Sequence, residues 1–124
     1  MRSATAAGDL TGGMFAAIDT KDGAAFVSYL TEAAVFRFGS APPVQGRDAI
    51  QAAVEGFFTT IAGCSHNIAK SLRQDDTVVC EGEVTYQRHD GSSITLPFTD
   101  VFEYDGDLIA HYKIYIDVVP LYAE

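Results

Sequence analysis

The chain has 124 residues, of which 48% are hydrophobic and 20% are charged, and its formal net charge is −9. These values are typical of a globular chain rather than a disordered one. The acidic balance argues against nucleic-acid binding, which needs clustered Lys and Arg side chains. The N-terminal segment lacks the apolar core of a signal peptide, and no run of about 18 apolar residues occurs. We therefore expect a cytoplasmic protein without a membrane span, folded as one domain over residues 1–124 with a loose tail at residues 1–8.

The first half of the chain has its apolar residues at helical spacing. Leu10, Met14 and Ile18 lie four apart and predict a helix that residues 20–23 end. A short second helix carries Phe26 and Leu30. Residues 35–38 predict a brief strand, and residues 41–43 a loop. A third helix follows Gly46, with Asp48 as its expected N-cap and a buried stripe formed by Ile50, Val54, Phe57 or Phe58, and Ile61.

After Gly63 the apolar period changes to two, which indicates strands. We expect these strands at residues 66–72, 77–88, 94–104 and 108–119, separated by turn-forming residues at 75–76, 89–91 and 105–107. Such short connections predict antiparallel hairpins. Helices followed by a meander of strands predict an α+β fold in which the helices cover one face of the sheet.

Acidic residues occur on strand faces that are otherwise apolar. Asp100 is the only charged residue on the face formed by Ile94, Leu96, Phe98, Phe102 and Tyr104. A buried carboxyl there needs a partner or a proton, and burial raises its pKa. It is either a functional acid or one satisfied by backbone N–H groups or a tyrosine.

Four other residues are candidate site residues, each with a structural alternative. Asp117 lies at the apolar end of the last strand, where it is either functional or a turn-forming acid before Pro120. Glu81 and Glu83 share the less apolar face of their strand, so they either line a pocket or face solvent. His66 opens a strand, and histidine is easily poised near neutral pH, but a lone strand histidine is often structural.

The motifs of several functional classes are missing. The sequence contains no dinucleotide-binding G-x-G-x-x-G, P-loop, nucleophile elbow or H-E-x-x-H. Three scattered histidines form no metal-ligand pattern, and Cys64 and Cys80 are expected to be reduced structural thiols. Any chemistry should therefore be proton transfer by carboxylate or histidine, with no metal and no cofactor; otherwise the site only binds.

Four segments together resemble the nuclear transport factor 2-like superfamily, and within it the SnoaL-like group. They are residues 44–50 (VQGRDAI), 96–102 (LPFTDVF), 106–109 (GDLI) and 115–117 (YID), and the likeness extends from about Leu10 to Leu121. The resemblance implies a cone in which three N-terminal helices cover a strongly curved antiparallel sheet and leave a deep pocket. It also implies a homodimer joined through the outer face of the sheet.

Relatives in this group include polyketide cyclases, ketosteroid isomerase and limonene epoxide hydrolase, so the resemblance assigns roles residue by residue. Asp117 corresponds to the last-strand acid/base of the cyclases and the epoxide hydrolase, and Asp100 to the protonated aspartate of the isomerase. The isomerase's base falls on Arg37, which cannot abstract a proton. The epoxide hydrolase's Arg-x-Asp pair corresponds to Glu81 and Glu83. The arginine is therefore replaced by an acid, and only the acidic member of the pair is retained.

The resulting hypothesis is an enzyme that performs isomerase-, cyclase- or hydratase-type acid/base chemistry on an apolar carbonyl compound. Asp117, Asp100, His66 and Glu83 are its expected catalytic residues. The alternative is a ligand-binding or dimerisation module of the same fold. The expected pocket walls are Phe15, Phe26, Phe36, Phe38, Phe57, Phe98 and Tyr115.

Overall fold

The computed structural model describes residues 7–123, which form four helices and one six-stranded sheet. In chain order the elements are α1 (Ala7–Asp19), α2 (Gly23–Val27), β1 (Leu30–Phe38), β2 (Val44–Gln45), α3 (Arg47–Phe58), β3 (Gly63–Gln74), β4 (Thr77–Gln87), β5 (Ser93–Asp105), β6 (Leu108–Tyr115) and α4 (Val119–Tyr122). The loose tail expected at residues 1–8 falls on residues 1–6, which lie outside the described residues, and on residues 7 and 8, which belong to α1. Among residues 7–123, no helix is long and apolar enough to cross a membrane.

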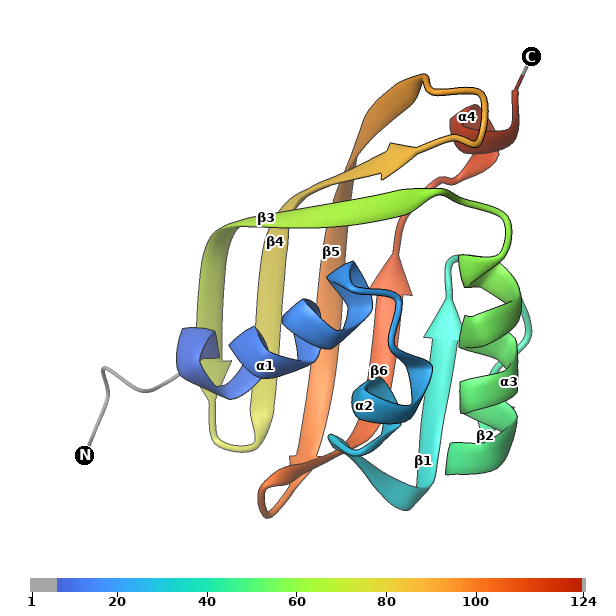
Figure 1. Ribbon diagram of the computed structural model, residues 1–124. Helices are drawn as coiled ribbons and strands as arrows, with labels where there is room; N and C mark the ends of the chain where they lie inside the picture. The colour runs from blue at the N-terminus through green and yellow to red at the C-terminus, as the bar shows by residue number, and fades with distance from the viewer. Residues whose placement is uncertain (1–6, 124) are drawn as a thin grey trace.

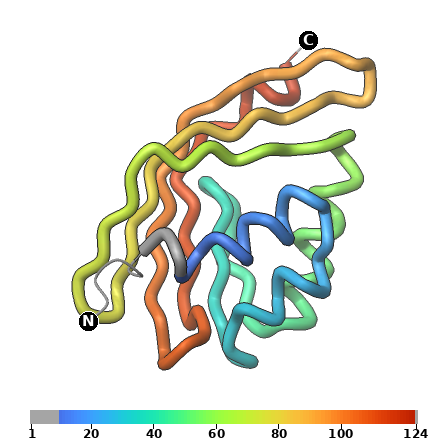
Figure 2. Tube along the Cα trace, turned by 60° about the vertical axis from the view of Figure 1, so that its left-hand side comes forward, coloured from blue at the N-terminus to red at the C-terminus, as the bar shows by residue number. Residues whose placement is uncertain are grey.

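The strand order is β2-β1-β6-β5-β4-β3, and α1, α2 and α3 lie on one side of the curved sheet (Figures 1 and 2). The predicted α+β class is confirmed, as are the antiparallel hairpins that connect β3, β4, β5 and β6 in turn. The strand pairing and the number of helices differ from the expectation. The sheet is mixed, because β1 pairs with β6 in parallel, and a short fourth helix, α4, follows the last strand.

The ends of α2 and α3 differ in how they are capped. Asp22 caps α2 by accepting a hydrogen bond from the backbone N–H of Ala25 at 3.0 Å. This helix ends at Val27, so Leu30 opens β1 instead of continuing the helix as expected. The N-cap of α3 is Gly46, not Asp48, which lies in the first turn, where a carboxylate favours the helix dipole.

Gly82 on β4 lies where this strand and β3 approach each other very closely. A Cβ atom at this position would collide with the backbone oxygen of Asn67 on β3, so only glycine allows the two strands to approach this closely. The pairing of β3 with β4 shifts register between Ile68 and Lys70 directly beside it. A bulge and a glycine at one place bend a sheet sharply, and this bend turns the sheet around the helices.

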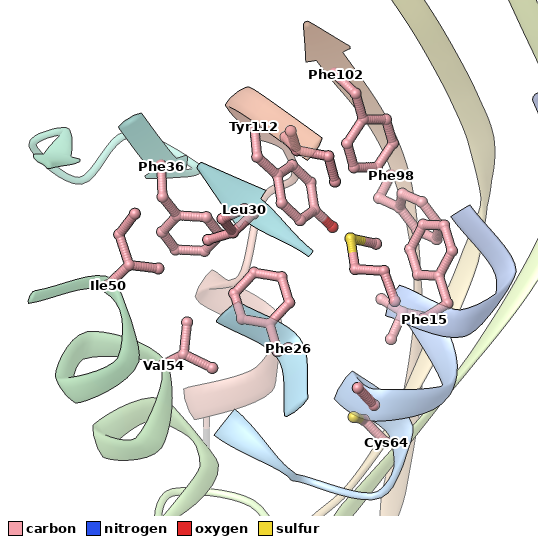
Figure 3. Packing of buried hydrophobic residues seen from close by; sticks show 14 of the residues in the cluster. Phe15, Phe26, Leu30, Phe36, Ile50, Val54, Cys64, Phe98, Phe102 and Tyr112 are labelled. Atoms are coloured by element: carbon pink, nitrogen blue, oxygen red, sulfur yellow. The ribbon is translucent and has the colours of Figure 1, made fainter. Parts of the chain in front are cut away.

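The core lies between the helices and the concave face of the sheet and is rich in aromatic rings (Figure 3). Tyr112 is at its centre, 4.4 Å from the ring of Phe102 and 5.5 Å from that of Phe36, measured between centroids. The inward faces predicted for β4 and β5 are correct: Val78, Cys80, Val84 and Tyr86 on β4, and Leu96, Phe98, Asp100, Phe102 and Tyr104 on β5, are all buried.

Strand β6 does not alternate regularly. Its pairing with β5 shifts register after Ile109, so that Glu103 pairs with His111 and Tyr104 with Ile109. Both Ile109 and Tyr112 are therefore buried, although simple alternation places them on opposite faces. This bulge brings the Tyr112 hydroxyl into the interior.

Candidate functional site

A cavity of about 200 Å³ lies between α3 and the concave face of the sheet. Most of its wall is apolar and comes from α3, β1, β4, β5 and β6, together with the loop at residues 41 and 42. The polar side chains on the wall are those of Cys64, His66, Tyr86, Asp100 and Tyr112. A concave, mostly apolar space with a few polar groups is the usual form of a small-molecule site.

Asp100 lies in the middle of β5 and is 1% exposed. The Tyr112 hydroxyl donates a hydrogen bond of 3.0 Å to its Oδ2 atom. Within residues 7–123, Oδ1 of Asp100 has no hydrogen-bond partner. Burial raises the pKa of Asp100 to about 8, against the lowering effect of the Tyr112 hydrogen bond.

It follows that Asp100 is mainly neutral at pH 7. Because Oδ2 accepts from Tyr112, the acid proton belongs on Oδ1, where it forms an O–H donor without a protein partner. Burial and the charge of Asp100 raise the pKa of Tyr112, so its hydroxyl keeps its proton. Tyr112 and Asp100 thus form a fixed pair of donors, of which the second is free to bind a ligand.

His66 lies near the start of β3, where Asp19 from the end of α1 approaches it. Oδ1 of Asp19 is 2.6 Å from Nδ1 of His66, and Oδ2 accepts a hydrogen bond of 3.1 Å from the His66 backbone N–H. The His66 side chain is 11% exposed and that of Asp19 29% exposed. The imidazole also contacts Phe15 and Phe98, with centroid distances of 5.0 and 5.4 Å.

Cys64 completes this corner of the cavity, and its thiol donates to the backbone oxygen of Ile18 at 3.5 Å. Burial, followed by the charge of Asp19, raises the pKa of Cys64 to about 12. The thiol is therefore protonated near neutral pH and is a poor nucleophile. Atoms of Asp19, Cys64 and His66 lie within 4.8 Å of one another, so the same corner has the residue types that hold a metal ion.

Tyr86 lies on the wall beside Cys64, its partner across β3 and β4. Burial raises its pKa first, and the charges of Cys64, Asp100 and Asp19 raise it further. Its hydroxyl is therefore a proton donor near neutral pH, within electrostatic reach of both the Asp100 corner and the Asp19 corner. Asp100 and His66, one from each polar corner, line the same cavity.

Two of the four acids and bases expected at the site line the cavity, and two do not. Asp100 and His66 are on its wall. Asp117 and Glu83 are exposed and border a separate hollow on the outer face of the sheet, together with Glu81 and Tyr115. The expectation that all four share one pocket is wrong.

The reason is strand parity. On β4 the inward residues are Val84 and Tyr86, so Glu83 faces outward, which is the solvated alternative weighed above. Beyond the bulge in β6, Ile114 and Ile116 line the cavity, so Asp117 faces away from it. Oδ1 of Asp117 accepts a hydrogen bond of 3.0 Å from the backbone N–H of Val119, which is the turn-forming alternative.

Five of the seven expected wall residues line the cavity: Phe26, Phe36, Phe38, Phe57 and Phe98. Phe15 is buried but packs behind the wall, against His66 and Phe98. Tyr115 is 57% exposed and lies on the outer face. Arg37, the position assigned to the isomerase's base, is also exposed, and its Nε donates to the backbone oxygen of Ala41 at 3.0 Å.

Sequence reasoning missed Tyr112 and Asp19. Tyr112 could not be found by alternation, because the bulge at Ile109 decides which face it occupies. Asp19 did carry a signal, since an acid at the last position of a helix opposes the helix dipole. Its contacts with His66 explain why an acid is held there.

Many solved structures share this fold, and the three described next are distant in sequence. A protein with a ketosteroid isomerase-like fold from Catenulispora acidiphila, solved with trimethylamine, is 16% identical with a TM-score of 0.80, covering 86% of this chain and 84% of that one. A protein assigned as a SnoaL-like polyketide cyclase from Jannaschia sp. CCS1 is 13% identical with a TM-score of 0.81, covering 91% and 86%. An LEH-like epoxide hydrolase from M. tuberculosis is 16% identical with a TM-score of 0.77, covering 90% and 83%.

These likenesses concern the fold alone, because the identities are low. No curated protein matches the sequence. The family model of the SnoaL-like domain matches residues 12–112, which include most of α1, all of β1 to β5, the first part of β6, and both polar corners of the cavity. The chain belongs to the SnoaL-like domain family.

Proposed function

We propose that the protein binds a small monocyclic carbonyl compound in this cavity and performs isomerase- or cyclase-type acid/base chemistry on it. The observation that carries the proposal is Oδ1 of Asp100, a buried oxygen on a cavity-lining residue without a hydrogen-bond partner among residues 7–123. A buried polar atom without a partner is costly, and a ligand carbonyl that accepts its proton removes that cost.

The size of the cavity supports a small ligand. A cavity of about 150 Å³ lined by aliphatic and aromatic side chains holds benzene. The present cavity of about 200 Å³ suits a ring of similar size that carries a carbonyl group. The wall has few polar groups, so charged compounds would lose their hydration without replacement.

The chemistry needs a donor at the oxygen and a base near the adjacent carbon. A neutral buried acid stabilises the negative charge that develops on a carbonyl oxygen when an α-proton leaves. Asp100 supplies that donor, and His66 is the base expected at the site that also lines the cavity. Asp117 and Glu83, on the outer face, are not part of this proposal.

Binding of cyclohexanone, measured by calorimetry, tests the ligand class. Asp100→Leu removes the donor and should weaken binding roughly 3- to 10-fold, the worth of one hydrogen bond. Asp100→Asn keeps a donor and should bind like the wild type, as should Asp107→Asn in the exposed turn after β5. Equal affinity of the Leu variant and the wild type would contradict the proposal.

Exchange of the α-protons of cyclohexanone for deuterium in D₂O, followed by NMR, distinguishes an enzyme from a binding module. If the protein is an enzyme, the α-protons of cyclohexanone should exchange faster in its presence than in buffer alone. Binding without exchange would favour the alternative that the site only holds a ligand.

We also propose a homodimer joined through the outer face of the sheet. Tyr115, 57% exposed on that face, supports it as a large apolar side chain available to a second copy. Light scattering should give twice the mass of the chain, and Tyr115→Glu should halve it. Tyr122→Glu, at an exposed tyrosine of α4, is the control, and a monomeric wild type would refute the dimer.

A further inference from the structure

The Asp19 carboxylate holds His66 at two points. One oxygen meets the ring at Nδ1 and the other meets the backbone N–H of the same residue, at 2.6 and 3.1 Å. A contact with the ring alone would leave the strand free to shift relative to α1. The second bond fixes the backbone as well, so the orientation of the imidazole is set by the packing of α1 on β3.

The bond to Asp19 also decides which ring nitrogen carries the proton. A carboxylate only accepts hydrogen bonds, so Nδ1 must be the donor, and in the neutral ring the lone pair is on Nε2. Phe15 and Phe98 contact the ring and oppose a flip that would exchange the two nitrogens. Within residues 7–123, Nε2 has no hydrogen-bond partner, while His66 lies on the cavity wall.

We infer that Asp19 and His66 form a catalytic dyad, in which Nε2 of His66 is the general base of the cavity and Asp19 is its positioning residue. This inference rests on the proposed function and adds a residue that was not among the site residues expected from the sequence. Asp19 is absent from the cavity wall, so it acts through His66 and not on the ligand.

The step is a proton transfer that balances within the site. Nε2 takes a proton from the carbon next to the carbonyl, and the electrons of that C–H bond form a C=C bond. The carbonyl oxygen becomes an enolate or enol oxygen, stabilised by the proton on Oδ1 of Asp100. The imidazolium that forms is stabilised by the Asp19 carboxylate, and it returns the proton to carbon.

The groups around His66 are compatible with this role. Cys64 is a neutral thiol, since burial raises its pKa to about 12. The Lys21 ammonium donates a 2.9 Å hydrogen bond to the backbone oxygen of Ile61 rather than to a group of this corner. Asp19 is therefore the one charged group of residues 7–123 in contact with the ring.

The tautomer of His66 can be measured without any substrate. Imidazole nitrogen shifts in ¹⁵N-labelled protein distinguish an Nδ1–H ring from an Nε2–H ring, and the spectrum of His66→Gln identifies the signals among the three histidines. We expect the Nδ1–H form in the wild type. In Asp19→Asn the amide can donate as well as accept, and we expect the Nε2–H form to appear. An Nε2–H ring in the wild type would overturn the dyad.

Cyclohexanone exchange then tests the catalytic role. His66→Gln should lower kcat by roughly 10²- to 10⁴-fold, the contribution of a general base. Asp19→Asn should lower kcat by roughly 10- to 100-fold with KM unchanged, because it alters the base and not the binding surface. The matched controls, His111→Gln and Asp107→Asn, change exposed residues of the same types and should exchange like the wild type.

The outcomes separate this inference from the proposed function. Failure of the wild type to bind cyclohexanone overturns both. Binding that depends on Asp100, with exchange that is absent or insensitive to His66 and Asp19, overturns the dyad alone. Loss of wild-type exchange after treatment with EDTA would also overturn it, since Asp19, Cys64 and His66 would then act as metal ligands.

Discussion

Tyr112 on β6 and Asp100 on β5 are diagonal neighbours across the two strands, and the tyrosine hydroxyl donates a 3.0 Å hydrogen bond to one carboxyl oxygen of the aspartate. The bond leaves the other oxygen, Oδ1, without a partner among residues 7–123. A neutral acid whose proton is directed to one oxygen by a fixed neighbour is preorganised to donate to a ligand. Four predictions depend on this arrangement and on the position of the cavity.

Replacing Asp100 by Asn should change how stability depends on pH. The pKa of Asp100 is about 8 in the folded protein, against about 3.9 in an unfolded chain, so the folded state binds a proton that the unfolded state has released. This contribution is largest at low pH and is lost as pH rises from about 4 to 8, by up to about 1.4 kcal/mol per unit. Urea unfolding over this range should show a flatter profile for Asp100→Asn; an unchanged profile would contradict the neutral acid.

Removing the Tyr112 hydroxyl should raise the pKa of Asp100 further. The hydrogen bond from Tyr112 lowers that pKa, so Tyr112→Phe removes the lowering effect and leaves Oδ2 without its donor. The free energy of unfolding should fall by about 1 to 3 kcal/mol. The loss of stability with pH should also extend to higher pH than in the wild type. Tyr115→Phe, on the outer face, should change neither quantity.

Narrowing the cavity at its exposed wall should block the ligand while sparing the fold. Ala53 on α3 lines the cavity but its side chain is exposed, so Ala53→Phe adds volume without displacing the core. Affinity for cyclohexanone should fall roughly tenfold or more, because a fragment-sized ligand depends on most of its contacts. Ala52→Phe is the matched control, since Ala52 is exposed on the same helix but does not line the cavity. Equal effects of the two changes would indicate that the ligand binds elsewhere.

Changing the acids of the outer face should leave the inner site intact. Asp117→Asn keeps an acceptor for the Val119 backbone N–H, and Glu83→Gln keeps the size of an exposed side chain. Both variants should bind and exchange cyclohexanone like the wild type. Should Asp117→Asn abolish exchange, the acid of the outer hollow would be the catalytic one and the site proposed above would be wrong.

Much of the fold was predictable from local patterns. Burial of one face imposes a regular spacing of apolar residues along a helix or strand. This spacing is visible in the helical stripe of Leu10, Met14 and Ile18 and in the alternation on β4 and β5. Asp100 could be selected as a buried acid for the same reason, since a charged residue on a regular apolar face is buried together with that face.

The remainder required tertiary structure, because bulges and helix packing are not periodic. The register shift after Ile109 places Ile109 and Tyr112 on the same face, which alternation along β6 does not predict, and from that face the Tyr112 hydroxyl reaches Asp100. Asp19 and His66 are 47 positions apart in the chain, so their contact depends on how α1 packs across β3. The sequence by itself thus determined the α+β fold and the buried acid, whereas long-range packing decided which residues meet that acid in one cavity.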